Sequence, residues 1–425
     1  MDFNQRYALF YPEKRPFFLE GKEIFNFGGN ASGDPLGAIV HTRTIVDPLV
    51  GVKLSGKIGD RNMLASIYAL DELPETNGHQ DQAQFAIFRY KRALNSDSYV
   101  GGILTDREIP QGFNRVAGAD GHYRFSESSA VGFHAFMSQD RTDSLSETNK
   151  GHAFGVDLTK GNRNGNLRFA VQDISENFRT GTGYVTRTGI ALFSAGVVRS
   201  LHVNGRFIRR LDPQVNATQI RDEPSGKYET SESFDLRLMY TGSSSIQAGY
   251  VYSTEIYLAQ KFDTRALRLV ASNQLSKQIS FSAKYIRGLK IRYTDDPFQG
   301  YGDDLTGSFT YQPSDKLNLG LNLTYSDLYQ SSNLTKVYDY TIIRSRNVSQ
   351  LNRYLFFRGI VEYNSFRKRV LTDFLASVTY IPGTVIHFGY GSICEKPEDA
   401  LPRGDLGFRE TARSFFFKAS YLWRL

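Results

Sequence analysis

Apolar and polar residues alternate along many stretches of this chain, and this two-residue period is the feature that most limits the folds open to it. In residues 316–325 the apolar positions are Leu317, Leu319, Leu321, Leu323 and Tyr325. The same period recurs at residues 131–137, 246–252 and 279–285. Because successive side chains of a strand point to opposite faces, each stretch predicts a β-strand with one apolar face.

The connections between these strands fall into two kinds that alternate along the chain. Short polar turns, such as residues 95–98 and 275–278, follow every second strand. Longer polar loops are predicted near residues 73–81, 106–114, 139–148, 213–227, 294–303 and 393–411. Short turns at one end and long loops at the other are typical of a transmembrane antiparallel β-barrel, with the turns in the periplasm and the loops outside the cell. The strand count is about 20–22, and 22 is favoured because an even number returns both termini to the periplasm.

Composition agrees with an all-β chain. The sequence holds 25 Tyr, 31 Phe and 38 Gly against one Trp and 4 Met, a balance that favours strands and tight turns. No stretch approaches the roughly 18 consecutive apolar residues of a membrane-spanning helix. A sheet in hydrocarbon must close, since its edge groups have no water to bind. A barrel of this width has a lumen that is either water-filled or plugged.

The last predicted strand, residues 412–425, places aromatic side chains on one face and stops at the end of the sequence. Its proposed assembly signal is Phe415, Phe417, Tyr421, Trp423 and Leu425. A terminal aromatic strand of this kind predicts recognition by the barrel-assembly machinery during insertion. The alternative is the last strand of a soluble sheet.

Charge and cysteine content exclude some classes of protein. The formal net charge of +7 is spread along the chain without a block of Lys or Arg, so no nucleic-acid partner is expected. The single cysteine, Cys394, has no partner for an intrachain disulfide. The first residues lack the apolar core of a secretory signal. We therefore expect the C-terminal part of a larger protein, located in the outer membrane of a Gram-negative bacterium.

Several motifs in order along the chain resemble one bacterial family. They are FYPEKRPFFLEG at residues 10–21, GVKLSGK at 51–57, VGGILT at 100–105, YIPGT at 380–384 and FFKASYLW at 416–423. They are similar to motifs of the outer-membrane barrel family called domain of unknown function 5916. Members commonly carry an upstream domain similar to carbohydrate-binding family 9 modules, which this sequence does not contain. The resemblance implies a barrel, and any sugar binding would belong to that other domain.

The stretch before the first predicted strand divides the chain into residues 1–36 and a barrel of residues 37–425. The first part contains the family signature, Phe10, Tyr11, Pro12, Glu13, Lys14, Arg15, Pro16, Phe17, Phe18, Leu19, Glu20 and Gly21. Its prolines disfavour a strand, and its aromatic residues are unusual for a solvated linker. We expect it to fold back into the lumen as a plug, with its charges paired to inward-facing ones. The alternative is a tether to another domain.

Catalytic and metal-binding patterns are weak. His134 and Ser138 share a face of one predicted strand, with Asp140 beyond, but about 13 Å of strand separates the first two, too far for a Ser–His hydrogen bond. Acidic pairs at 295–296 and 303–304 are expected to be loop charge rather than a calcium or glycosidase site. The seven histidines show no ligand spacing. No catalytic residue, metal or cofactor is predicted.

The expected function is that of a pore, transporter or scaffold in the outer membrane. Arg89, Lys91 and Arg206 are predicted to face the lumen, where they would favour anionic solutes. The alternative is a glycan-binding or glycan-hydrolysing outer-membrane protein whose binding module is missing from this chain. The expected partners are membrane lipid, the assembly machinery, a glycan ligand and other envelope proteins.

Overall fold

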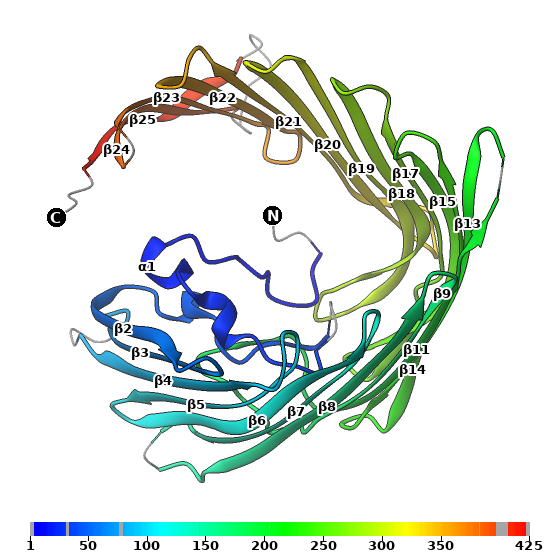
Figure 1. Ribbon diagram of the computed structural model, residues 1–425. Coiled ribbons are helices and arrows are strands. Elements are labelled where there is room, and N and C mark those ends of the chain that lie inside the picture. Colours follow the sequence, from blue (N-terminus) through cyan, green and yellow to red (C-terminus); the bar gives the residue numbers. More distant parts are fainter. Residues whose placement is uncertain are drawn as a thin grey trace.

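The computed structural model describes residues 4–30, 34–75, 80–143, 145–203, 205–381, 383–396 and 407–421. One large antiparallel sheet bends into a barrel, and the N-terminal residues lie inside the ring (Figure 1). The first strands of the barrel are β2 (Pro48–Ile58), β3 (Asn62–Glu72), β4 (Gln82–Ala93), β5 (Tyr99–Ile109), β6 (Gly112–Ser126), β7 (Ser129–Arg141), β8 (Asn149–Asn162), β9 (Gly165–Ile174), β11 (Ile190–Arg199), β13 (Ile208–Asp222) and β14 (Lys227–Tyr240).

The second half of the ring continues in the same antiparallel order. Its strands are β15 (Ser245–Tyr257), β17 (Ala266–Gln274), β18 (Ile279–Arg292), β19 (Phe298–Ser314), β20 (Leu317–Gln330), β21 (Lys336–Gln350), β22 (Leu355–Asn364), β23 (Arg369–Ile381), β24 (Thr384–Glu395) and β25 (Arg409–Ser420). Two short strands, β12 (Leu201–His202) and β16 (Gln260–Asp263), pair with β13 and β15. The expected fold class, an all-β antiparallel barrel, is confirmed.

The register explains the alternation seen in the sequence. Phe309 of β19 pairs with Leu321 of β20, and both side chains are more than 40% exposed on the outer face. Leu323 pairs with Ile343 of β21 on that same face. The outer surface is therefore apolar, as a face in contact with lipid requires. Within the described ranges, no helix is long and apolar enough to cross a membrane.

The connections show the predicted asymmetry, with three exceptions, one of which is the loop predicted at residues 294–303, because β19 already begins at Phe298. The described turn between β2 and β3 has three residues, whereas the connection from β9 to β11 runs from Ser175 to Gly189 at the opposite end. The loop predicted at 106–114 is wrong, because β5 and β6 continue to a two-residue turn at residues 110–111. The loop predicted at 213–227 is also wrong, because β13 extends to Asp222. Polar residues there lie on the strand ladder, as in the pair Asp106 and Arg115.

The barrel begins later than the sequence suggests. The predicted boundary after residue 36 falls within β1 (Leu36–Ala38), which pairs with β10 (Tyr184–Val185) rather than with a barrel strand. Before and after it lie a short helix α1 (Pro16–Leu19) and two 3-10 turns, η1 (Lys22–Phe25) and η2 (Thr42–Thr44). Residues 4–30 and 34–47 of the described chain thus precede the first barrel strand, and they are called here the N-terminal segment.

Candidate functional site

The N-terminal segment packs on the inner face of the barrel through two apolar clusters. In the first, Phe18, Ile24, Phe25 and Ile45 contact the inward-facing side chains of β3 and β4, with Phe85 among them. In the second, Leu36 and Ile39 are completely buried against Phe136 and Ile174 of the wall. Burial of large apolar side chains stabilises the contact by about 1.5–3 kcal/mol each. The segment is therefore held in the lumen by a hydrophobic core of its own.

A buried ion pair anchors the middle of the segment. Arg89 of β4 and Asp120 of β6 form a salt bridge with both side chains fully buried. Arg89 also donates from Nε to the Ile24 carbonyl at 3.1 Å and from Nη2 to the Asn26 carbonyl at 2.9 Å. Asp120 accepts from the Gly28 backbone N–H at 3.0 Å. Each charge thus has partners in both the wall and the segment, the condition under which a buried pair is tolerated.

Two consecutive glycines let the segment lie against the wall. A Cβ at Gly28 would collide with the carbonyl of Gly121 on β6. Gly29 has φ of +70°, and a Cβ there would come within 2.7 Å of the Phe133 Cα. Only glycine fits both the backbone angle and the close approach. His134 Nδ1 lies 3.1 Å from the Gly28 carbonyl and completes this contact.

The charges of residues 10–21 pair mainly within the segment, contrary to the prediction that they pair with inward-facing charges of the wall. Glu13 accepts hydrogen bonds from the Arg15 guanidinium at 2.8 Å and from Thr42 Oγ1 at 2.7 Å. Arg15 also donates to the Ile45 carbonyl. Burial raises the pKa of Glu13, but hydrogen bonds from Arg15, Thr42 and the Lys14 N–H outweigh it, so the pKa lies well below its usual 4.5.

The other signature residues divide between the core and the lumen. Phe18 is buried, whereas Phe10, Tyr11 and Phe17 are 41–53% exposed. Lys53, on the inner face of β2, donates to the carbonyls of Phe17 and Glu20. Pro12 and Pro16 lie on either side of the charged residues 13–15. Pro16 is the first residue of α1, where the backbone N–H that proline lacks would have no partner within the helix. Leu19 and Gly21 complete the turn into η1.

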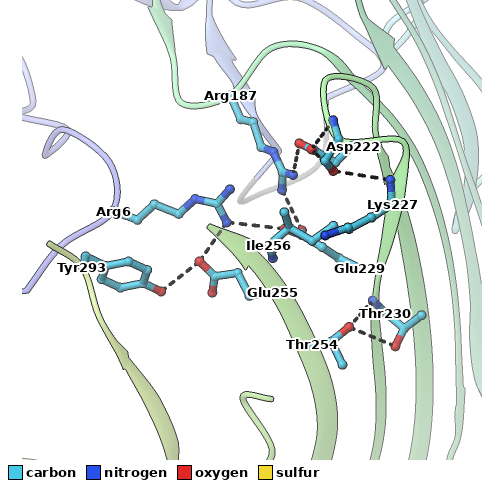
Figure 2. A network of polar contacts seen from close by, with 11 residues as sticks. Arg6, Arg187, Asp222, Lys227, Glu229, Thr230, Thr254, Glu255, Ile256 and Tyr293 are labelled. Carbon is cyan, nitrogen blue, oxygen red and sulfur yellow. Dashed lines mark hydrogen bonds and ion pairs between the residues drawn. The ribbon is translucent and has the colours of Figure 1, made fainter. Parts of the chain in front are cut away.

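A second polar network holds the start of the segment on the opposite wall (Figure 2). Arg6 donates to Glu255 of β15 at 2.8 Å and lies 3.5 Å from Glu229 of β14. Arg187, from the connection between β9 and β11, binds Glu229 at 2.6 Å and Asp222 at 2.7 Å. Two guanidinium groups thus share three carboxylates. The segment spans the lumen from β4 to β15.

Neighbouring groups tighten this network. Tyr293 donates its hydroxyl to Glu255 at 2.9 Å, and burial followed by the charge of Glu255 raises the pKa of Tyr293. Asn4 makes two hydrogen bonds to the barrel backbone, donating to the Ile291 carbonyl and accepting from the Tyr293 N–H, both at 2.8 Å. Burial lowers the pKa of the Arg187 guanidinium, but its hydrogen bonds to Glu229 and Asp222 outweigh burial and raise the pKa above its usual value. This guanidinium therefore stays charged.

A cavity of about 760 Å³ lies beside this network. The hydroxyl-bearing residues along it include Ser194, Thr218, Ser231, Ser253 and Thr264. Hydroxyl groups can donate and accept hydrogen bonds, so this wall suits a polar solute. Glu229 and Glu255 are committed to arginines, which leaves them unsuited to act as a free acid and base pair.

His134, Ser138 and Asp140, which the sequence spacing placed too far apart for a Ser–His pair, each have different partners. His134 contacts Gly28, Ser138 accepts from the Arg179 N–H at 3.3 Å, and Asp140 accepts from Asn114 at 3.0 Å. Their inward orientation agrees with the sequence interpretation, but His134 and Ser138 hold segments that lie inside the wall, and Asp140 joins two neighbouring wall strands. No group of three metal-ligating side chains occurs in the ranges that the structure covers.

The acidic pairs also separate. Asp303 accepts from the Tyr285 hydroxyl at 2.7 Å, while Asp304 accepts from Lys290 at 2.8 Å and Ser326 at 2.6 Å. Neighbouring residues of β19 point to opposite faces, as the strand period requires. Asp295 and Asp296 are exposed in the turn before β19.

The arginines and lysine predicted to meet solutes have three different environments. Arg89 is completely buried under the segment and is not open to the lumen. Lys91 packs over the Tyr99 ring on the same inner face. Arg206 is exposed between β12 and β13, outside any strand. The inward orientation predicted for Arg89 is confirmed, but the N-terminal segment covers this guanidinium, so it does not meet solutes. The prediction for Arg206 is wrong, because the strand pattern did not reveal where the strand ends.

The terminal strand has its aromatic residues on the outer face. Phe415 and Phe417 on β25, and Tyr421 just after it, are 62–74% exposed. Trp423 and Leu425 of the predicted assembly signal lie outside the described residues. The role of this strand in assembly stays a prediction.

Sequence reasoning missed the second network altogether. Arg6 and Glu255 are 249 positions apart, and neither belongs to a motif. The one local signal was that Glu229 and Glu255 occupy inward positions of otherwise amphipathic strands. That pattern predicts a charge facing the lumen but does not identify the residue with which it pairs.

Comparison with solved structures identifies the class of fold. The structure is similar to the copper transporter OprC, with a TM-score of 0.54 and 9% identity over 81% of this chain and 72% of that one. It is also similar to the siderophore receptor PirA from Pseudomonas aeruginosa, with a TM-score of 0.51 and 12% identity over 80% of this chain and 72% of that one. The siderophore receptor PirA from Acinetobacter baumannii matches with a TM-score of 0.50 and 7% identity over 79% of this chain and 68% of that one. The chain has the β-barrel fold of outer-membrane receptors.

The expected location in the Gram-negative outer membrane agrees with these matches of fold. No family model matches the sequence. No curated protein matches it either. The resemblance to domain of unknown function 5916 and to proteins with carbohydrate-binding modules therefore has no support from these comparisons.

Proposed function

We propose that this chain is an outer-membrane transporter barrel whose N-terminal segment acts as a plug and controls passage of a polar solute. The observation that carries the proposal is the attachment of residues 4–47 to two distant parts of the inner wall. One attachment is the Arg89–Asp120 pair, and the other is the Arg6–Glu255 pair. A segment that only connected the barrel to another domain would not need either of these attachments to the inner wall.

The two attachments differ in strength, which suits a plug that moves in part. Five apolar residues of the segment are buried with wall side chains in two apolar clusters, namely Phe18, Ile24, Phe25, Leu36 and Ile39. The region around Arg6 is held by polar contacts beside a cavity. Hydrogen bonds to charged groups are worth about 1.5–3 kcal/mol each, so a solute that competes for them can release this end while the core remains.

The matched proteins supply a functional analogy. OprC is a copper transporter and PirA is a siderophore receptor. By analogy of fold, uptake through a plugged barrel is the activity we assign here, with a solute that the hydroxyl-lined cavity accepts. Membership of the family indicated by residues 10–21 remains part of the proposal.

Conductance in planar bilayers tests the plug. The wild-type chain is expected to conduct in small, infrequent steps, and deletion of residues 1–30 is expected to give a large, stable conductance. Arg6→Ala should increase the frequency of opening without changing the barrel. Arg210→Ala is the matched control, since Arg210 pairs with Asp212 on the wall at 2.9 Å. Unchanged conductance in the deletion variant would remove the plug from the proposal.

A further inference from the structure

The wall of the cavity of about 760 Å³ carries hydroxyl side chains in one row. Ser194 of β11 pairs with Thr218 of β13, and Thr218 pairs with Ser231 of β14. Ser231 pairs in turn with Ser253 of β15, and all four residues line the cavity. Directly paired residues of neighbouring strands share a face of the sheet. Because neighbouring strands lie about 4.8 Å apart, the row is about 14 Å long.

Three of these four hydroxyl groups are open to a ligand. Among the described residues, no hydrogen bond engages the hydroxyls of Ser194, Thr218 or Ser231, and each of these residues is partly exposed. On β18 and β19, by contrast, the hydroxyls of Ser282 and Ser308 bond to each other at 2.8 Å. A hydroxyl group can donate one hydrogen bond and accept two. The row therefore has unused hydrogen-bonding capacity along a line on the cavity wall.

The charged groups around the cavity are engaged with each other. The charged residues that line it are Arg6, Asp34, Arg187, Glu229 and Glu255. The two arginines bind the two glutamates at 2.6–3.5 Å, and Asp34 also has an interaction partner. A charged ligand would lose its hydration here without gaining an unpaired counter-charge, which is costly. The cavity therefore favours an uncharged ligand.

The N-terminal segment contributes an aromatic ring to the same cavity. Tyr7 is one of the lining residues, and it is 37% exposed. The Arg6 guanidinium lies over this ring, 4.9 Å from its centroid, and holds the ring beside the charged network. A tyrosine ring presents an apolar body together with a polar end. The cavity thus combines a line of hydroxyl groups on the wall with an apolar ring on the segment.

We propose that this cavity binds an uncharged oligosaccharide. A sugar ring carries hydroxyl groups around its edge and C–H groups on its faces. The edge can exchange hydrogen bonds with the row of Ser194, Thr218 and Ser231, while a face packs on Tyr7. The row is longer than a single sugar ring, so the ligand contains more than one. This inference rests on the proposed function, because it names the solute of the same cavity.

Titration calorimetry on the purified full chain, in a detergent without a sugar headgroup, tests the ligand class. The uncharged probes are maltotriose and cellotriose, which differ in linkage. The charged probes are trigalacturonate, an anion, and the chitosan trisaccharide, a cation. We expect at least one uncharged probe to bind about tenfold more tightly than either charged one. Uncharged probes that do not bind, or that bind no more tightly than the charged ones, overturn the proposal.

Substitutions that remove hydroxyl groups at nearly constant volume test the row. Thr218→Val with Ser231→Ala should weaken saccharide binding about tenfold, since two hydrogen bonds are lost. Thr306→Val with Ser308→Ala, on β19, is the matched control and should keep the wild-type affinity. Tyr7→Ala should also weaken binding, whereas Tyr7→Phe should not, because the ring rather than its hydroxyl makes the contact. Circular dichroism confirms that each variant is folded. Wild-type affinity in the variant of the row would overturn the assignment.

These measurements separate the saccharide site from the plug. Binding is measured in detergent, whereas the plug is tested by conductance after deletion of residues 1–30. Saccharide binding together with unchanged conductance of the deletion variant would remove the plug and leave the site. A large conductance of the deletion variant without saccharide binding to the full chain would remove the site alone.

Discussion

The wall beneath the N-terminal segment and the wall around β18–β21 are built from the same kind of strand, yet their inner faces differ. On β3 and β4 the inward residues Ile67, Phe85 and Ile87 are at most 2% exposed. On β18 and β21 the inward residues Lys284 and Arg344 are exposed. The first wall is apolar on both faces and the second only outside. An inner face can be apolar only where protein rather than water covers it.

The largest expected difference between the two walls comes from their arginines. Arg89→Ala leaves Asp120 buried without its partner, at a cost of about 3–5 kcal/mol in the free energy of unfolding. Arg344→Ala, which breaks a half-exposed pair with Glu362 at 3.6 Å, should cost less than about 1 kcal/mol. Denaturant unfolding in detergent measures both. Equal losses would mean that the segment does not bury Arg89.

A smaller difference is expected for apolar truncation. Ile67→Ala removes a side chain from the cluster with Phe18 and Ile24 and should cost about 3 kcal/mol. Thr306→Ala on the inner face of β19 should change stability by about 0.5 kcal/mol or less. Limited proteolysis of the N-terminal segment gives a second readout, since only Ile67→Ala should increase cleavage there. If both variants are equally protected, the apolar cluster does not hold the segment.

Acidification should loosen the covered wall first. The folded-state pKa of Glu13 lies below the 4.5 of the unfolded chain, so its contribution is complete above pH 4.5 and is lost as the pH falls towards the folded value. Glu13→Gln should lose about 1.5 kcal/mol at pH 7 and show less dependence on acid. Proteolysis of residues 4–47 against pH measures this. A Glu13→Gln variant with the wild-type acid profile would contradict the assignment.

Substitutions of inward-facing charges on the exposed wall are expected to change stability least. Their effect is therefore measured as a change in ion selectivity. Arg344→Gln with Arg346→Gln should leave stability within about 0.5 kcal/mol of wild type. In a barrel opened by deletion of residues 1–30, the same pair should shift the reversal potential away from anions, because charges in the lumen set ion preference. A reversal potential unchanged by the double variant would mean that these arginines do not line the path.

Strand identity was predictable because it depends on neighbours in sequence. Of the strand predicted at residues 316–325, residues 317–325 lie in β20, and their apolar side chains are on the outer face. The orientation of β4 was less apparent, since Phe85 and Phe88 lie on opposite faces and both are apolar. The polar stretches near 106–114 and 213–227 gave false loops, because strands that extend past the membrane carry polar pairs on their ladder.

The functional contacts were less predictable because they join distant parts of the chain. Arg6 meets Glu255 across 249 positions, and Arg89 meets the carbonyl of Ile24 across 65. Charges in residues 13–15 gave no sign that they would pair with each other and with Thr42. A sequence pattern records side-chain type and spacing, whereas a lumen contact depends on which strands the ring brings opposite each other.

The amino-acid sequence by itself determined a set of amphipathic strands with an apolar outer face, because the pleat makes alternate side chains share a surface wherever the strand lies. Tertiary structure alone decided which inner face the N-terminal segment covers. That depends on which strands the ring brings opposite each other and where the segment enters it, and these are properties of the whole chain rather than of any stretch.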